Sequence, residues 1–306
     1  MKISLIDVDG HNFPNLSLMK IAAYHKKVGD AVDWYSPLFS DPDRVYASKV
    51  FSFTPDIMDY AARHPEPIRG GTGYDITTKL PDEIENMKPD YSIYPQYDFA
   101  VGFLSRGCIR QCSFCVVPSK EGTIHPVADI EEVAVKGRKT TVLMDNNFLA
   151  NERDFVRVQL QKIASMKLRI DFNQALDCRL VDDENARWLA ACKWGSRAGG
   201  TGYIRFACDH QSVIGPCKDA ISKVRRAGFS GEIFVYVLAK DVNESFDRMQ
   251  QIMVDKNIIP FIMPFRDISG NGTIKRDVNQ LARWANRLWL RKSCTFDEYK
   301  KGIGGK

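Results

Sequence analysis

The chain has 306 residues, of which 44% are apolar, and its formal net charge is +5. This length can bury one large core, or a barrel-sized core and a smaller partner domain, and the modest charge does not by itself indicate a nucleic-acid binder. Because no apolar run approaches the roughly 20 residues of a membrane span, and the N-terminal apolar run is too short for a secretory signal, we expect a cytoplasmic protein with no membrane partner.

Residues 1–77 are predicted to form a small Rossmann-like α/β domain. Apolar and periodic patterns predict strands at 3–8, 31–35 and 44–53, a helix at 16–27, and a glycine turn at 68–73. Such turns at strand ends are where open α/β sheets usually bind ligands. A linker is expected over 78–96, where Pro81, Pro89 and Pro95 interrupt any regular element.

From residue 97 onward, strand-like and helix-like runs alternate. Six short apolar runs predict strands at 99–104, 140–144, 168–173, 203–207, 233–238 and 258–263. This alternation is typical of a parallel βα array, so the chain is predicted to be an α/β protein. We assign 97–292 to this array and 293–306 to a C-terminal tail.

Three cysteines follow the first strand of the array with the spacing CxxxCxxC: Cys108, Cys112 and Cys115. A chain with eight cysteines and no predicted secretory signal is expected to use them for metal or redox chemistry. A structural zinc site would need a fourth ligand, for which His125 is a candidate, and plain buried thiols are the other alternative. Three thiolates on a 4Fe-4S cluster would leave one iron without a protein ligand.

This motif, with the aromatic Phe114 just before its last cysteine, resembles the radical S-adenosylmethionine (SAM) superfamily. The resemblance covers about residues 99–286 and implies a partial (β/α)6 TIM-like barrel. It also implies that SAM chelates the unique iron, and that an electron from a flavodoxin or ferredoxin type of donor cleaves SAM to a 5′-deoxyadenosyl radical. The cofactors would supply the chemistry and the protein would orient them. The substrate is not identified by the sequence.

The resemblance further suggests SAM contacts at the ends of the second and third array strands. Family members carry an acidic or Gly-Gly-Glu segment for the methionyl amine, and this chain has Asp145 and Asn146 there without the Gly-Gly-Glu form. An Asx turn is the alternative. Asn173 and Arg179 would contact the ribose and the carboxylate, although Arg179 could instead form a surface ion pair with Asp182 or Asp183.

Two further cysteines, Cys178 and Cys208, lie just past predicted strand ends. Either could give a hydrogen atom to a substrate radical, and simple burial is the alternative. The catalytic residues are otherwise unknown from the sequence.

The small first domain resembles the cobalamin-binding domain of some radical SAM enzymes. Its loop 9–14 keeps Asp9 and His11 of the cobalamin-ligating pattern but has Pro14 in place of glycine, and Gly70 and Gly71 could lie under the nucleotide tail. A cobalamin-dependent radical SAM methyltransferase is therefore one alternative function. A domain that serves only as a scaffold or lid is the other interpretation.

Nucleic acid remains a candidate partner because Arg283, Arg287 and Arg291 recur every four residues on the predicted last helix. An RNA-modifying radical enzyme is thus a second alternative, and a solvated helix face is the simpler interpretation of the stripe. The segment 115–122 resembles that of tRNA methylthiotransferases, but residues 1–107 lack the three cysteines of their second cluster. A non-catalytic iron-sulfur sensor is the third alternative.

Overall fold

The computed structural model describes residues 1–57, 60, 62–267 and 273–304. The chain divides into two compact units, the first of which ends at Asp98 and the second of which begins at Phe99. Both contain parallel sheets with helices, which confirms the predicted α/β class. Within the described part of the chain, no helix is long and apolar enough to cross a membrane.

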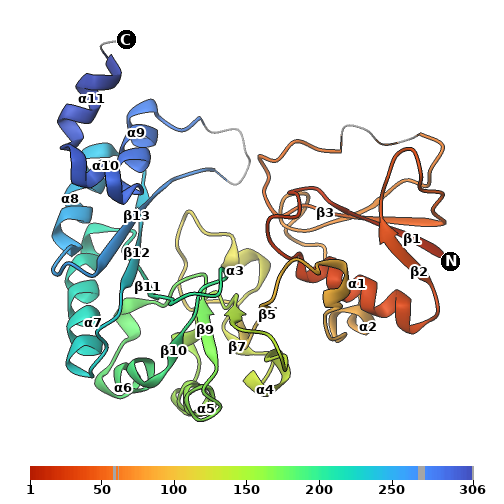
Figure 1. Cartoon of the computed structure of the whole chain (residues 1–306), viewed down its shortest axis with the longest axis horizontal. Coiled ribbons are helices and arrows are strands. Elements are labelled where there is room, and N and C mark those ends of the chain that lie inside the picture. The colour runs from red at the N-terminus through yellow and green to blue at the C-terminus, as the bar shows by residue number, and fades with distance from the viewer. Residues whose placement is uncertain (58–59, 61, 268–272, 305–306) are drawn as a thin grey trace. The chain divides into compact units, whose positions relative to one another are not determined.

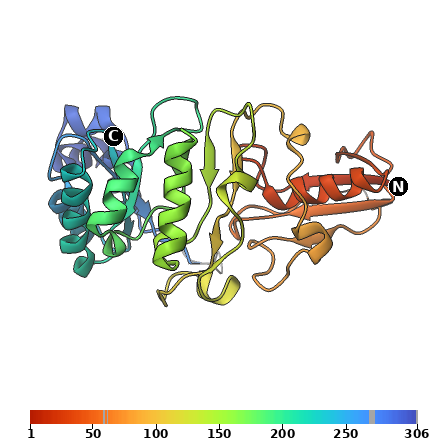
Figure 2. The same ribbon diagram turned by 90° about the horizontal axis from the view of Figure 1, so that it is seen from below.

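The first unit contains a parallel sheet of order β2-β1-β3-β4, with α1 running along one face (Figures 1 and 2). Its core joins apolar side chains of β1 and α1, among them Leu5 and Leu18. The elements are β1 (Lys2–Asp7), α1 (Leu16–Lys27), β2 (Ala31–Trp34), β3 (Arg44–Ser48) and β4 (Ile68–Gly70).

The predicted strand at 44–53 was too long, because β3 ends at Ser48. The carboxylate of Asp9 accepts hydrogen bonds from the backbone N–H groups of Val50 and Phe51, and from the Thr54 hydroxyl at 2.6 Å. These bonds draw the chain into a loop. The stretch 78–96, expected to be a linker, contains α2 (Asp82–Glu85) and the 3₁₀ turn η1 (Tyr91–Ile93). Ile84 packs into the core of the first unit.

The second unit contains two parallel sheets, of order β10-β9-β8-β5 and β11-β12-β13, joined by a parallel bridge between Leu176 and Phe206. All six predicted strands are present, and β10 adds a strand to the first of these two sheets. The strands are β5 (Ala100–Gly102), β8 (Thr141–Leu143), β9 (Arg169–Phe172), β10 (Lys193–Trp194), β11 (Ile204–Ala207), β12 (Ile233–Ala239) and β13 (Ile258–Pro264).

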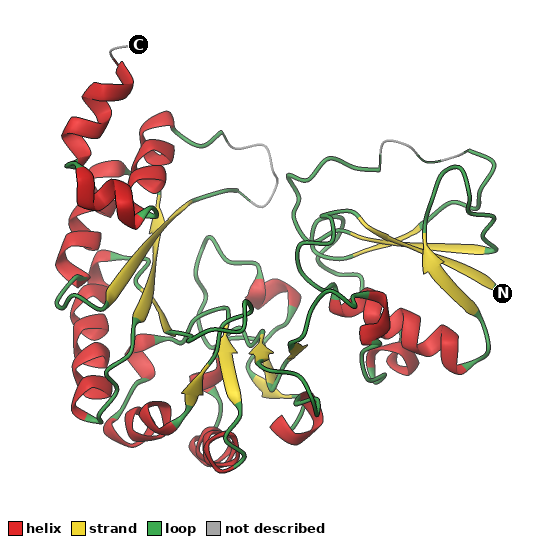
Figure 3. Cartoon of the chain, viewed as in Figure 1, coloured by secondary structure: helices red, strands yellow, loops and turns green. Residues whose placement is uncertain are grey.

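Helices of the second unit lie on the outer side of these strands (Figure 3). They cover a continuous apolar core that includes Phe172, Phe206 and Val235. The main helices are α5 (Arg153–Ser165), α6 (Asp183–Ala191), α7 (Ile214–Arg226), α8 (Val242–Ile252) and α9 (Arg276–Ala285). Shorter ones are α3 (Val117–Lys120), α4 (Ile130–Val133), α10 (Leu288–Ser293), α11 (Phe296–Gly304), and the 3₁₀ turns η2 (Phe148–Ala150), η3 (Cys178–Leu180) and η4 (Gln211–Val213).

The prediction of one continuous last helix with a basic stripe is wrong, because the chain turns between α9 and α10. The carboxamide of Asn286, directly after α9, both donates to and accepts from the backbone of Ile262 in β13. Arg283 therefore belongs to α9 and Arg291 to α10, with Arg287 at the junction. Arg291 is half-buried, so the three guanidinium groups do not form one exposed stripe.

Residues 293–306, expected to be a tail, contain α11. Its Phe296 is buried, with ring centroids 5.5 Å from Trp284 and 5.8 Å from Phe246. These aromatic contacts attach α11 to the α8 and α9 layer, and Trp284 is only 3% exposed.

Candidate iron-sulfur loop

The three cysteines of the motif lie in a loop, residues 107–124, that is closed at its base. The strands β6 (Ser105–Arg106) and β7 (His125–Pro126) pair antiparallel on either side of it. Just above them, the Cys108 N–H donates to the Gly122 carbonyl at 3.2 Å. Gly107 has a φ of +83°, and a Cβ there would lie 2.2 Å from the Thr123 carbonyl oxygen. Only glycine fits this close approach.

Three consecutive side chains after β8 hold the start of this loop and the strand β6 just before it. The Asp145 carboxylate accepts from the Leu104 and Ser105 N–H groups and from the Ser105 hydroxyl. Asn146 Oδ1 accepts from the Gly107 N–H at 3.0 Å. Because β5 and β8 are paired in parallel, their carboxyl ends meet at one edge, and the loop after one can bond to the loop after the other.

Asp145 is 2% exposed, and burial raises its pKa to about 6 in spite of these hydrogen bonds. Both of its carboxylate oxygens are engaged by backbone N–H groups of Leu104 and Ser105, at the start of β6. This geometry argues against the predicted contact of Asp145 with a methionyl amine and makes Asp145 a positioning residue of the cysteine loop. Asn146 has the same kind of role.

Asn147, the third residue after β8, contacts a cysteine directly. Its Nδ2 donates to Cys108 Sγ at 3.3 Å, and the Arg110 N–H donates to the same sulfur at 3.3 Å. Hydrogen bonds to ligand sulfurs are one of the means by which proteins set iron-sulfur potentials. The sequence places Asn147 in the same polar segment as Asp145 and Asn146, but its contact with a cysteine was not predicted.

Burial raises the pKa of both Cys112 and Cys115, and the neighbouring cysteine thiols add to each shift. Cys108 and Cys112 are half-buried, whereas Cys115 is exposed. Among the described residues, no three His, Cys, Asp or Glu side chains converge as ligands of a single metal ion would. An iron-sulfur cluster is held by thiolates on separate irons. The donor set, three thiols with N–H groups directed at Cys108, fits such a cluster.

Asp177 links the cysteine loop to the end of the third strand of the array. Its carboxylate accepts from Arg110 Nε at 2.9 Å, and from Arg179 Nε at 2.6 Å and Nη2 at 3.0 Å. Burial raises the pKa of Asp177, but the two guanidinium groups outweigh it and hold the pKa below its usual value. Arg179 pairs with this residue, and neither Asp182 nor Asp183 is its partner. Asp177 was also missed, and its N-cap position before η3 was the only signal.

Asn173 lies just past β9 and is half-buried. Its Nδ2 approaches Met144 Sδ at 3.9 Å, a long contact that leaves much of its hydrogen-bonding capacity unused. Phe114 is 36% exposed on the cysteine loop, and the Lys240 ammonium lies 5.7 Å from its ring centroid. Lys240 follows β12 and also lies 4.3 Å from the Phe265 ring, after β13. The structure thus brings the ends of β12 and β13 close to the cysteine loop.

Cys178 and Cys208 are fully buried in the core beside Cys217 of α7. The Cys178 thiol donates to the Ala207 carbonyl at 3.4 Å, and interactions with both other thiols raise the pKa of Cys217. This placement favours the packing interpretation over hydrogen-atom transfer. His125 Nδ1 lies 2.9 Å from the Thr123 carbonyl at the base of the loop, an exposed position that gives no sign of a zinc ligand set.

The first unit does not reproduce a cobalamin-ligating histidine pattern. A ligating imidazole usually has its other nitrogen bonded to a carboxylate, carbonyl or water. The Asp9 carboxylate is engaged by the loop after β3, and in the described part of the chain neither His11 ring nitrogen has a hydrogen-bond partner. The His11 ring instead packs on Trp34 at 4.1 Å between centroids.

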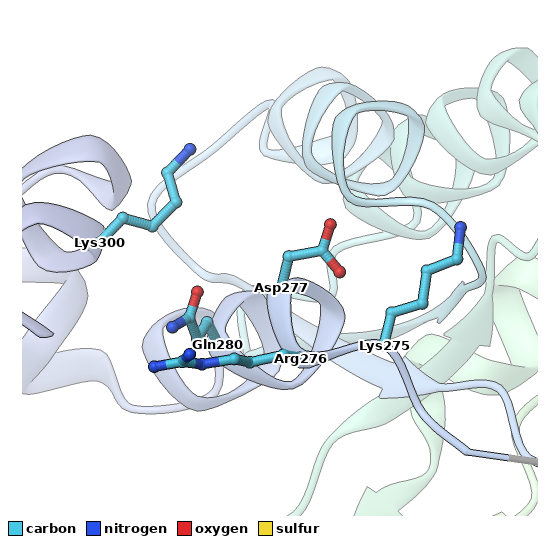
Figure 4. Close-up of a pocket in the computed structure, with 5 residues that line it drawn as sticks. All are labelled: Lys275, Arg276, Asp277, Gln280 and Lys300. Atoms are coloured by element: carbon cyan, nitrogen blue, oxygen red, sulfur yellow. The ribbon is translucent and has the colours of Figure 1, made fainter. Parts of the chain in front are cut away.

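A surface hollow of about 590 Å³ lies elsewhere in the second unit (Figure 4). It is lined by charged and polar side chains of the α9 start, such as Arg276 and Asp277, with Lys300 projecting from α11. None of the predicted cofactor contacts lines it. A neighbouring hollow of about 550 Å³ includes Arg283, one residue of the proposed basic stripe.

No model of a known protein family matches this sequence, and no curated protein sequence matches it.

Proposed function

We propose that this protein is a radical SAM enzyme. The observation that carries the proposal is a three-cysteine loop fixed at the carboxyl edge of a parallel sheet, with N–H groups of Asn147 and Arg110 directed at Cys108. Active sites of parallel α/β folds lie at this edge. When bound, the cluster and SAM would supply the reductive cleavage that generates a 5′-deoxyadenosyl radical.

We further propose that the two sheets of the second unit are the two parts of a partial (β/α)6 barrel. Their strands are all parallel, and the bridge between Leu176 and Phe206 joins β11 to the turn after β9. Helices follow most of the strands, as the right-handed βαβ rule requires for parallel neighbours. The inner face of such a barrel would be the place for a substrate.

The chain's own residues would divide into ligands and positioning groups. Cys108, Cys112 and Cys115 would each bind one iron. Asp145 and Asn146 fix the start of the loop, and the polar network around Asp177 fixes Arg110 inside it. Preorganised ligands of this kind avoid a cost of reordering when the cluster assembles.

At the open side of the cluster, the groups available to SAM would be Phe114, Asn173 and Arg179. Phe114 offers an exposed aromatic face and Asn173 a carboxamide with unused capacity. Arg179 retains one terminal nitrogen beyond the two that bind Asp177. A planar guanidinium suits a carboxylate, which SAM carries.

The test is anaerobic reconstitution with iron and sulfide, followed by reduction in the presence of SAM, with dithionite or a flavodoxin as electron donor. We expect 5′-deoxyadenosine and methionine in equal amounts, and none from the triple variant Cys108→Ala, Cys112→Ala, Cys115→Ala. An intact cluster that yields no 5′-deoxyadenosine with either donor would sink the enzyme proposal and leave an iron-sulfur sensor.

A further inference from the structure

One face of the β11-β12-β13 sheet is lined with aromatic side chains that are not fully covered. Outward residues of these strands, such as Phe206 and Val235, are completely buried against the helices. The alternate residues Tyr203, Phe234, Tyr236 and Phe261 face the other way and are half-buried. We call these four side chains the aromatic face. Parallel sheets are normally buried on both faces, so the partial exposure of this one is a departure from the rule.

The rings of the aromatic face form one continuous surface. The centroids of Phe234, Tyr236 and Phe261 are 5.0 to 5.8 Å apart, and Tyr203 lies 5.8 Å from Phe234. The register of the strands pairs Tyr236 with Phe261 and Arg205 with Phe234. Side chains in register share a face of the sheet, and the cluster is therefore built into the strand pairing.

A guanidinium lies beside these rings, with its charge compensated. Arg205 lies over Phe234 at 5.1 Å and over Tyr203 at 5.5 Å. Its Nε and Nη2 donate to Asp171 at 2.6 and 2.9 Å, and Asp171 is 0% exposed. The Tyr236 hydroxyl donates to the Asn173 carbonyl at 3.3 Å. The face thus offers flat π surfaces and polar edges, and the charge of its own guanidinium is compensated.

These properties select a neutral, planar ring with polar edges as the occupant. Aromatic side chains stack on every nucleobase, because each base has a π face. A phosphate or carboxylate would find the guanidinium of Arg205 already paired with the Asp171 carboxylate. Among the described residues the Tyr203 hydroxyl has no hydrogen-bond partner, and a hydrocarbon ring would offer it none, which is unfavourable in a partly desolvated site.

The aromatic face belongs to the sheet whose carboxyl end approaches the cysteine loop. Tyr236 and Phe261 each lie three residues before the last residue of their strand, a distance of about 10 Å along the strand. At that end, Lys240 contacts the Phe114 ring. A base stacked on the aromatic face would therefore lie about 10 Å along the strands from the sheet end that approaches the cysteine loop.

We propose that the aromatic face binds a nucleobase of the substrate, either in a free nucleoside or nucleotide or in a single-stranded nucleic acid. The role of this site in catalysis rests on the radical SAM function proposed above, but its binding chemistry does not require the cluster. The face is separate from the exposed ring of Phe114 at the sheet edge.

The experiment measures binding of the four ribonucleosides, and of a short single-stranded RNA, to the full chain by saturation-transfer NMR and equilibrium dialysis. It uses the triple cysteine variant, so that no cluster is needed. We expect at least one nucleoside to bind, and Phe261→Leu to weaken it about tenfold, the effect of losing one stacking ring. Tighter binding of the RNA would indicate a nucleic-acid source, and equal affinity a free nucleoside or nucleotide.

Phe246→Leu is the matched control, because Phe246 is half-buried in a ring cluster on the helix side of the sheet. Circular dichroism checks folding, and Tyr203→Leu provides a second test should Phe261→Leu fail to fold. The proposal is overturned if no nucleoside or RNA binds, if Phe246→Leu weakens binding as much as Phe261→Leu, or if S-adenosylhomocysteine displaces all of the bound nucleoside.

The two proposals fail in distinguishable ways. Nucleoside binding without 5′-deoxyadenosine formation would reject the radical function and keep the base site. Formation of 5′-deoxyadenosine without nucleoside or RNA binding would do the reverse.

Discussion

Gly107 offers the sharpest test of how the cysteine loop is closed. Replacing it with alanine forces a Cβ to within 2.2 Å of the Thr123 carbonyl oxygen and 2.6 Å of the Thr123 carbonyl carbon. These are backbone atoms, which cannot rotate away as a side chain could. Gly122, on the opposite side of the loop, also has a positive φ of +73°, but nothing lies within 4 Å of a Cβ there. Gly122→Ala is therefore a matched control, because it places alanine in a left-handed backbone conformation without creating a steric clash.

The expected magnitudes differ by a measurable amount. The left-handed conformation costs alanine about 1 to 2 kcal/mol at either position. Gly107→Ala must in addition separate the two sides of the loop, which breaks the Cys108 to Gly122 hydrogen bond and strains the β6–β7 pairing. Each broken hydrogen bond costs about 1 kcal/mol net, in addition to the cost of the left-handed backbone, so the stability of the closed loop should fall by about 3 kcal/mol or more in total.

Hydrogen exchange of the peptide covering 107–124, measured by mass spectrometry on iron-free protein, reports this loss without reference to the cluster. We expect exchange about tenfold faster in Gly107→Ala than in Gly122→Ala. Iron content after reconstitution should fall in the same order. Equal exchange and equal iron content in the two variants would refute the close approach at Gly107.

Three other predictions concern buried groups. Burial raises the pKa of Asp145 to about 6, so the folded state retains a proton that the unfolded state releases. The free energy of unfolding should therefore fall as the pH rises from about 4 to about 6. A ¹³C NMR titration midpoint of the Asp145 carboxyl near pH 4 would contradict this prediction. Asp171→Asn should lower the free energy of unfolding by about 3 kcal/mol in urea denaturation, because it leaves the Arg205 charge without its carboxylate. The double variant with Arg205→Met should recover part of this stability. Equal losses of stability in the two variants would argue against a buried ion pair. Alkylation of native, iron-free protein should label Cys115 quickly and leave Cys178 and Cys208 protected, since both are in the core; labelling of all three at one rate would place those two thiols at the surface.

The strands were predictable because they are short apolar runs bounded by turn residues, and these runs alternate with segments of helical periodicity. Such a run is too short for a buried helix and fits a strand buried on both faces. The errors arose where one polar side chain redirected the backbone. Asp9 ended β3 early by binding the N–H groups of Val50 and Phe51. Asn286 ended α9 by bonding across to Ile262, and periodicity alone gave no warning of that tertiary contact.

In the candidate site, too, local sequence patterns could not predict the contacts between distant parts of the chain. The cysteine spacing indicated the loop, but the roles of its neighbours depended on which strand end lies beside which. The pairing of β8 with β5 directs Asp145 and Asn146 at the loop backbone, where the sequence suggested a cofactor contact. Asp177 receives Arg110 from another part of the chain, a partnership that no local pattern encodes.

Electron paramagnetic resonance of the reduced, reconstituted protein tests the central claim most directly, because it reports whether one iron of the cluster is open to SAM. We predict a 4Fe-4S signal, dependent on Cys108, Cys112 and Cys115, whose g values change when SAM is added. A signal that is identical with and without saturating SAM would contradict a three-cysteine cluster with an open iron.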